Sequence, residues 1–363
     1  MNIDNIWQDF AEKEAFSGVF SVRRGREVLF EQCQGYRHLS EGLPIGSDTA
    51  FGIASGTKLF TGLAVCKLID TGRLALDEKI GDILPYDLGQ IDPAVTVFQL
   101  LTHTSCVGDY IDEDTPDGGI GQLAGLYEKY PVHLWERLSY YLPMITPLAP
   151  KFTAGERFGY SNSGYVLLGL IIEAVVGKYY QDYVTQYIIK PCGMSNTGFY
   201  RTDALPANTA MGYMQDDETQ LWHSNIFCLP IVGGADGGLH TTAEDLVKLW
   251  DGIFTHKILS PKMTHSFLTP HVLMDVDNAY DAYGLGVYMR GLGKQPPRPG
   301  RPANLKNTLY YAVGGDFGVD FFTAYFPAEN ITASALGNTE VNTFPLLEAL
   351  INEQKDKLPR RTK

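Results

Sequence analysis

The hydrophobic pattern divides the chain into a β-rich beginning, a helical middle and a β-rich end. Residues 3–14 carry apolar side chains at helical spacing. Residues 16–24 and 27–36 are rich in β-forming side chains, and they meet at Gly25-Arg26. These patterns predict an amphipathic helix followed by a β-hairpin.

The middle of the chain reads as helical. Residues 48–54 lead into a largely apolar segment that predicts a buried helix beginning at Ser55 and capped by Gly72. Further helices are expected over residues 96–103, 165–176 and 245–254, the last preceded by a capping-box pattern.

Strand patterns return near the C-terminus. Strands are expected over residues 283–290, 308–314, 319–326 and 331–337, with a closing helix over 343–355. Strands at both chain ends favour a single sheet, so the predicted class is α/β (α+β type): a mainly antiparallel sheet flanked by helices, with an inserted helical domain. We expect residues 1–60 and 280–363 to form the sheet domain. Residues 61–279 would form a mostly helical insertion, with some segments packing on the sheet.

Composition excludes several classes of protein. The 363 residues include 44% hydrophobic side chains, which suffices for one large or two medium domains. A net charge of −13 argues against nucleic-acid binding and against adsorption to anionic membranes. The N-terminus resembles neither a signal peptide nor a membrane span, although a leader removed earlier would not be visible. Five scattered cysteines without a Cys-x-x-Cys motif predict free thiols. These features together predict a cytoplasmic protein.

Candidate chemistry begins at Ser55-Gly56-Thr57-Lys58, which has the form Ser-x-x-Lys. Residues three apart on a helix share a face, so the serine hydroxyl and the lysine amine can meet. A lysine shielded from water can lose its proton and then accept that of the serine. The motif therefore predicts acyl transfer through a serine ester. Tyr160-Ser161-Asn162 adds a hydroxyl that can relay protons and an amide that can orient the lysine.

A set of ordered motifs gives the chain a family resemblance. It resembles the serine β-lactamase and penicillin-binding-protein superfamily, particularly the branch of class C β-lactamases, D-Ala-D-Ala carboxypeptidases, D-aminopeptidases and related esterases. The matching segments are FGIASGTKLFT (51–61), LLTHTS (100–105), GERFGYSNSGYVLLG (155–169), PCGMSNT (191–197), GGLHTTAEDL (237–246) and AYFP (324–327).

The resemblance implies a role for each matched residue. It makes Ser55 the acylated nucleophile and Lys58 the proton acceptor or its partner. Tyr160 becomes the general base or a relay, and Asn162 orients the substrate and the lysine. The oxyanion hole would be formed by the backbone N–H groups of Ser55 and Gly315. Whether Lys58 or Tyr160 takes the serine proton is left open.

The third family motif, Lys/His-Thr/x-Gly, falls on Ala312-Val313-Gly314. Ala312 therefore replaces the cation that holds a substrate carboxylate in the family, which disfavours β-lactams and carboxypeptidase substrates. Gly314 would permit close approach of the substrate, and Tyr110 would border the pocket by analogy. A basic loop with Lys294, Arg298 and Arg301 is an alternative source of positive charge. Asp316 is expected to be a solvated turn residue, and if it faced the site instead it would favour cationic or neutral substrates.

These observations predict a serine hydrolase that acts through an acyl-serine intermediate on a carboxylic ester or small amide. The alternatives are a D-peptide or β-lactam hydrolase, and a family member that binds penicillin or peptide without hydrolysis. No metal or organic cofactor is expected, since His265 and His271 lack metal-ligand spacing. His103 is expected to be structural and Cys106 a buried thiol. The expected partner is a small ester, amide or peptide, and transfer to an acceptor other than water remains open.

Overall fold

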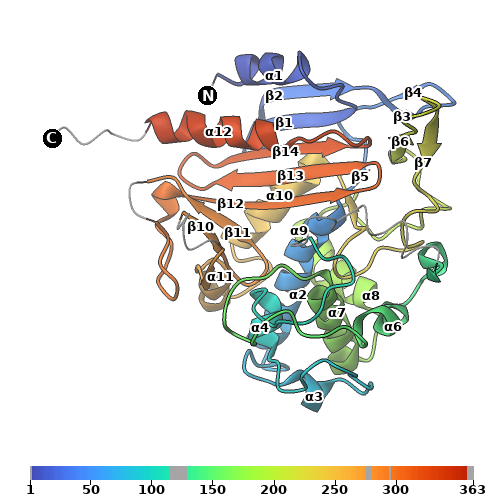
Figure 1. Cartoon of the computed structure of the whole chain (residues 1–363). Coiled ribbons are helices and arrows are strands. Elements are labelled where there is room, and N and C mark those ends of the chain that lie inside the picture. The colour runs from blue at the N-terminus through green and yellow to red at the C-terminus, as the bar shows by residue number, and fades with distance from the viewer. Residues whose placement is uncertain (1, 114–128, 275–279, 294–295, 358–363) are drawn as a thin grey trace.

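A large antiparallel sheet organises the molecule. The computed structural model describes residues 2–113, 129–274, 280–293 and 296–357. Among these residues the main sheet has eight strands in the order β2-β1-β14-β13-β12-β11-β10-β9 (Figure 1). The strands are β1 (Gly18–Arg24), β2 (Glu27–Gln34), β9 (Val272–Leu273), β10 (Asp281–Tyr283), β11 (Tyr288–Gly291), β12 (Thr308–Asp316), β13 (Val319–Phe326) and β14 (Ile331–Gly337). The N-terminal hairpin joins C-terminal strands through the β1–β14 pairing, which confirms the predicted fold class.

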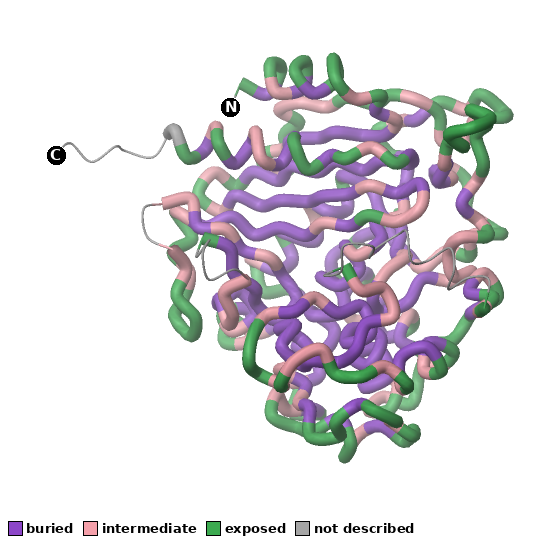
Figure 2. The backbone as a smooth tube through the Cα atoms, in the orientation of Figure 1, coloured by how far each residue is buried: buried purple, intermediate pink, exposed green. Residues whose placement is uncertain are grey.

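Strand alternation places hydrophobic residues on both faces of the sheet. On β13, Phe322 and Phe326 pack with α1 (Ile3–Ala11) and α12 (Phe344–Lys357) on one face. Tyr325 points to the opposite face, where Trp250 of α10 (Ala243–Phe254) stacks on it with ring centroids 5.7 Å apart. Figure 2 shows the result, a buried sheet between two helical layers.

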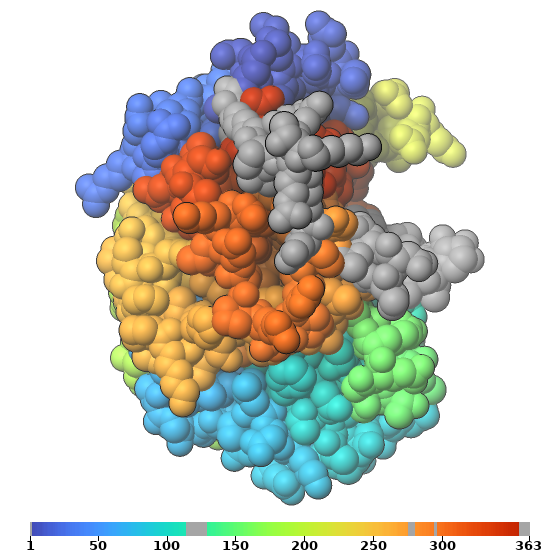
Figure 3. All heavy atoms as spheres, turned by 90° about the vertical axis from the view of Figure 1, so that its left-hand side faces the viewer, coloured from blue at the N-terminus to red at the C-terminus, as the bar shows by residue number. Residues whose placement is uncertain are grey.

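The second layer is built around α2 (Thr57–Asp70) and α7 (Asn162–Val176), whose residues are mostly buried. A helix that is apolar nearly all round is typical of a protein interior. In Figure 3 the residues that follow α2 form the end of the molecule opposite to α1. The shorter helices are α3 (Ile80–Ile83), α4 (Val97–Leu101), η2 (Val132–Leu134), η3 (Leu138–Tyr141), α6 (Leu142–Ile145), α8 (Tyr180–Val184), η4 (Thr185–Ile189), α9 (Lys190–Cys192), α11 (Pro261–Phe267) and η5 (Leu305–Asn307).

One predicted element is wrong. Residues 283–290 do not form a single strand, because they contain the end of β10, a turn and the start of β11. The turn includes Gly286 at φ 108°, a left-handed conformation that favours glycine. A Cβ on Gly286 would also lie 2.8 Å from the Cα of Gly62 on α2. The turn therefore allows α2 to pass close beneath the sheet.

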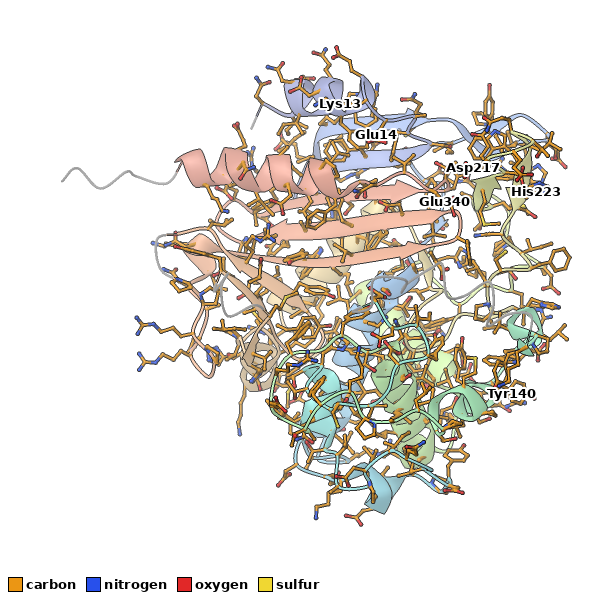
Figure 4. All side chains as sticks on the ribbon, viewed as in Figure 1. Lys13, Glu14, Tyr140, Asp217, His223 and Glu340 are labelled. Carbon is orange, nitrogen blue, oxygen red and sulfur yellow. The ribbon has the colours of Figure 1, made fainter. Side chains whose placement is uncertain are left out.

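Several small sheets complete the fold. They are formed by β3 (Tyr36–His38) with β4 (Leu43–Pro44), β5 (Phe51–Gly52) with β8 (His240–Thr241), and β6 (Tyr213–Gln215) with β7 (Trp222–Ser224). Asn338 ties the β6–β7 region to the sheet, since its Nδ2 donates to the carbonyls of Tyr36 and Met211. Figure 4 shows Asp217, His223 and Glu340 at this end of the molecule.

Two sequence-based predictions concern the whole chain. All five cysteines are free, as expected. None of the helices in the described part of the chain is long and apolar enough to cross a membrane. The division into a sheet domain and a helical insertion remains a prediction.

Candidate active site

Ser55 lies on a sharp turn between β5 and α2. The turn is the 3-10 helix η1 (Ala54–Gly56), and Ala54 within it adopts φ 43°. Such a conformation is costly for a residue with a Cβ and persists only where the surroundings enforce it. Thr57 supplies that support, since its hydroxyl donates to the Ala54 carbonyl at 2.8 Å and accepts from the Leu239 N–H at 3.0 Å. The Ser55 side chain is thereby held half-buried just before the N-terminus of α2.

Lys58 lies one turn further along and is only 2% exposed. Its Nζ is 2.9 Å from Ser55 Oγ, 2.7 Å from Asn162 Oδ1 and 2.7 Å from the backbone oxygen of Asp236. Burial lowers the pKa of the Lys58 amine, although nearby carboxylates partly oppose this effect. Two of its three partners are carbonyl oxygens that can only accept. A neutral Lys58 can therefore keep both of those hydrogen bonds and direct its lone pair at the Ser55 hydroxyl.

Asn162 is held by the N-terminus of α7, which is doubly capped. Ser161 Oγ accepts from the Gly164 N–H at 3.0 Å. The buried carboxyl group of Asp109 accepts from the backbone N–H groups of Asn162 and Ser163, each at 2.8 Å. Burial raises the pKa of Asp109 to about 7, although these hydrogen bonds act to lower it. Sequence reasoning missed Asp109, because no local motif marks it as the partner of a helix 53 residues away.

The ring of Tyr160 packs against the Lys58 amine. Lys58 Nζ lies 4.9 Å from the centroid of its ring, and the ring of His103 lies 4.6 Å away on centroids. Burial raises the pKa of Tyr160 well above its ordinary value, while a hydrogen bond with the Ser55 side chain acts in the opposite direction. The phenol is therefore favoured over its anion.

His103 holds the segment that contains Tyr160 and Ser161 in place. Its Nδ1 accepts from the Ser161 N–H at 3.1 Å, and burial holds its pKa well below the ordinary value. The neutral ring makes no hydrogen bond to Ser55 among the described residues, and its contacts match the structural role expected for it. Cys106 is buried at φ 62°, a left-handed conformation that favours glycine, and it lines neither of the cavities described below.

A cleft of about 490 Å³ opens beside Ser55. Of the residues predicted for the site, all but the underlying Lys58 line it: Ser55, Tyr110, Tyr160, Asn162, Gly314 and Gly315. At Gly314, β12 runs against the turn that carries Ser55, since a Cβ there would lie 2.3 Å from the Ile53 oxygen and 2.9 Å from the Ser55 nitrogen. Gly315 is exposed, with open space where a Cβ would lie.

Among the described residues of the basic loop, neither arginine takes the place of the cation that the family has at position 312. Ala312 is 5% exposed and packs in the core. Arg298 and Arg301 are exposed, and neither lines the cleft. Lys294 lies outside the described residues.

Asp316 differs from expectation. It is half-buried and lines the cleft rather than projecting into solvent. Burial, with smaller contributions from neighbouring carboxylates, raises its pKa to about 7. Sequence reasoning also missed Glu113, Asp236 and Tyr288, which line the same cleft. Only Asp236 had a local signal, because it is the one charged residue in the glycine-rich run 233–238.

Comparisons with known proteins agree with this geometry. A family model described as beta-lactamase matches residues 3–354. The chain belongs to the beta-lactamase family. A crystal structure of a penicillin-binding protein from Bacillus halodurans is 35% identical, with a TM-score of 0.83, over 97% of this chain and 99% of that one. A D-stereospecific amidohydrolase from Streptomyces sp. is 22% identical with a TM-score of 0.77, covers 96% of this chain and 97% of that one, and supports the beta-lactamase fold alone.

Curated members of the beta-lactamase family are longer. Penicillin-binding protein 4* of Bacillus subtilis is 27% identical over 297 residues, which are 78% of this chain and 62% of that protein. The chain thus spans about three fifths of the length of this relative. A further solved structure that shares the fold is EstCE1, described as a hydrolase with promiscuous acyltransferase activity, at 18% identity and a TM-score of 0.72 over 98% of this chain and 96% of that one.

Proposed function

We propose that the protein is a serine hydrolase that forms an acyl-serine at Ser55 and acts on a carboxylic ester or small amide. The observation that carries this proposal is the environment of Lys58. Its amine is buried, is held by two carbonyl oxygens and lies 2.9 Å from Ser55 Oγ. A base in this position can activate a serine that is otherwise a weak nucleophile.

The opposite pKa shifts of the two candidate bases favour Lys58. Its pKa is lowered, so the neutral amine becomes accessible, whereas the pKa of Tyr160 is raised, so its phenolate is disfavoured. In the first step Ser55 Oγ bonds to the carbonyl carbon and its proton passes to Lys58. When the tetrahedral intermediate collapses, the bond to the leaving group breaks and Tyr160 relays a proton to that group. Water then reverses the sequence and releases the acid.

Charge stabilisation would come from the backbone. The N–H groups of Ser55 and Gly315 are the proposed donors to the oxyanion, and removal of one such donor typically costs about 10²–10³-fold in kcat. The close approach of β12 to the nucleophile turn at Gly314 supports this assignment, because it brings the two backbone segments together.

The first alternative is a D-peptide or β-lactam hydrolase, and the second is a protein that binds such ligands without turnover. Ala312 counts against carboxylate-bearing substrates, since a buried methyl group stands where the family has a cation. Because the chain is similar to penicillin-binding proteins, the assay below also tests both alternatives.

The test is a side-by-side assay of short-chain p-nitrophenyl esters, D-peptides and β-lactams. We expect ester turnover by the wild type and a loss of about 10³-fold or more in both Ser55→Ala and Lys58→Met. Methionine keeps the length of Lys58 but removes the amine. Penicillin labelling without turnover of any substrate would favour the binding protein, and ester turnover retained in Ser55→Ala would refute the proposal.

A further inference from the structure

The cleft beside Ser55 is strongly acidic. Its described lining contains four carboxylate side chains and no lysine, arginine or histidine. These residues are Glu113, Asp236, Asp316 and Asp320. Lys58 lies beneath the cleft, and burial lowers the pKa of its amine. The cleft therefore presents a negative potential to an incoming substrate.

A second, largely apolar cavity adjoins this cleft. Its wall includes Val132, Leu205, Met211, Ile226 and Leu229. The two cavities share a set of lining residues, which are Tyr110, Ile111, Asp236, Gly237 and Asp316. Two of the carboxylates thus stand where the nucleophile's cleft meets the apolar side cavity.

One residue that lines the side cavity has an unsatisfied polar atom. His240 lines it and is 8% exposed, and its Nδ1 has no hydrogen-bond partner among the described residues. Burial lowers its pKa to about 4, so the ring is neutral, and a hydrogen bond to the Gly238 backbone accounts for one ring N–H. The remaining nitrogen is an acceptor. Leaving such a group unpaired costs about 1–3 kcal/mol.

The two carboxylates at the junction differ in their surroundings. Asp236 is 6% exposed, and its carboxylate accepts from the Tyr110 hydroxyl, which fixes its orientation. Asp316 is half-buried, and its Oδ1 accepts from the Phe317 N–H at 2.9 Å. Both are therefore anchored, and both face a space that no described cation enters.

Resting on the acyl-serine chemistry proposed above, we propose that the cleft selects substrates with a protonated amine beside an apolar side chain, the amine being bound by Asp316 and Asp236. The carbonyl carbon must reach Ser55, the amine must reach the junction, and the apolar group must enter the side cavity. An α-amino acid ester or amide carries all three arms on one carbon. The negative cleft also explains why the cation at position 312 is dispensable, because such a substrate brings no carboxylate to that position.

The experiment compares two matched esters at pH 7.5, which lies above the pKa of about 7 of Asp316 and below the ordinary α-amine pKa of about 7.7–8.0, so that both charges are populated. They are valine methyl ester, tested as both enantiomers, and 3-methylbutanoic acid methyl ester, which lacks only the amine; the small apolar group suits a side cavity of about 70 Å³. In the wild type we expect kcat/KM for the preferred amino ester to exceed that of the neutral ester by at least about tenfold, equivalent to about 1.4 kcal/mol. The ratio should fall as ionic strength rises.

Variants locate the effect. Asp316→Asn preserves shape and removes charge, and it should lower the ratio of kcat/KM for the amino ester to kcat/KM for the neutral ester about tenfold. Asp217→Asn makes the same charge change on an exposed residue of the β6–β7 hairpin (Figure 4) and should leave the ratio unchanged. If Asp316→Asn fails to fold, the salt dependence of the wild-type ratio tests the proposal instead. A ratio that does not change with ionic strength would overturn it.

The outcomes separate this inference from the function on which it rests. A neutral ester hydrolysed as fast as the amino ester would overturn the inference, as would a ratio unchanged in Asp316→Asn. Either result leaves the serine hydrolase intact. Failure to hydrolyse any ester, with no adduct on Ser55, would refute the proposed function as well.

Discussion

Gly314→Ala is the substitution whose effect the geometry defines most sharply. The added Cβ would lie 2.3 Å from the Ile53 oxygen, 2.8 Å from the Gly56 nitrogen and 2.9 Å from the Ser55 nitrogen. All three atoms belong to the backbone, so no side-chain rotation can relieve the overlap. Either β12 or the nucleophile turn must move.

The magnitude follows from this overlap. Overpacking of this kind typically costs about 1–3 kcal/mol. At about 2.1 cal/mol/K per residue, a chain of this length loses roughly 1–4 °C in Tm. The effect on catalysis should be larger, because a displacement of about 1 Å at a reacting group can cost about 10²-fold in rate. The Ser55 and Gly315 backbone donors would separate in the same movement.

The assay combines differential scanning calorimetry with kcat/KM for a p-nitrophenyl ester. Gly315→Ala is the matched stability control, since a Cβ there meets nothing within 4 Å. We expect a lowered Tm and a loss of about 10²-fold in kcat/KM for Gly314→Ala, and an unchanged Tm for Gly315→Ala. A Gly314→Ala protein with wild-type Tm and activity would refute the close contact between β12 and the nucleophile turn.

Three further predictions concern individual ionisable groups. Burial lowers the pKa of Lys58, and its neutral amine is the proposed base. The value of kcat/KM for a neutral ester should therefore rise with pH and level off below the ordinary lysine pKa of about 10.4. A rise that continues beyond that pH would contradict the role of Lys58 as the base. Asp109→Ala leaves two buried backbone N–H groups without an acceptor, so urea unfolding should show a loss of about 1–3 kcal/mol or more together with reduced activity, and unchanged values of both would exclude its capping role. The pKa of Asp320 is raised to about 6, so the folded state favours the neutral acid, and wild-type stability is lost as pH rises through that value. The Tm of Asp320→Asn relative to wild type should therefore be higher at pH 8 than at pH 5, and a pH-independent difference would show that the shift is absent.

Local patterns were sufficient for most of the fold. The strands near both ends and the helix α7 follow from apolar periodicity and from glycine or hydroxyl residues at their ends, such as Gly177 and Ser161. Ser55 and Lys58 could be paired because residues three apart share a helical face. The break within residues 283–290 could not be predicted from strand propensity, since it depends on contact between Gly286 and a distant helix.

The acidic lining of the site depends on long-range packing. Asp236 and Glu113 lie in irregular segments, and the Asp236 backbone oxygen meets Lys58 across 178 residues. Asp316 was misplaced because a residue after a strand is usually solvated, whereas this one closes the wall between two cavities. Spacing in the sequence contains no information about such contacts.

The central claim is that Ser55 is the residue acylated by substrate. Intact-protein mass spectrometry after reaction with a fluorophosphonate or a slowly hydrolysed ester, followed by peptide mapping, tests it directly. The account predicts one adduct per chain on Ser55, formed far more slowly in Lys58→Met and absent in Ser55→Ala. An adduct on another residue, or equal labelling of Ser55→Ala, would contradict it.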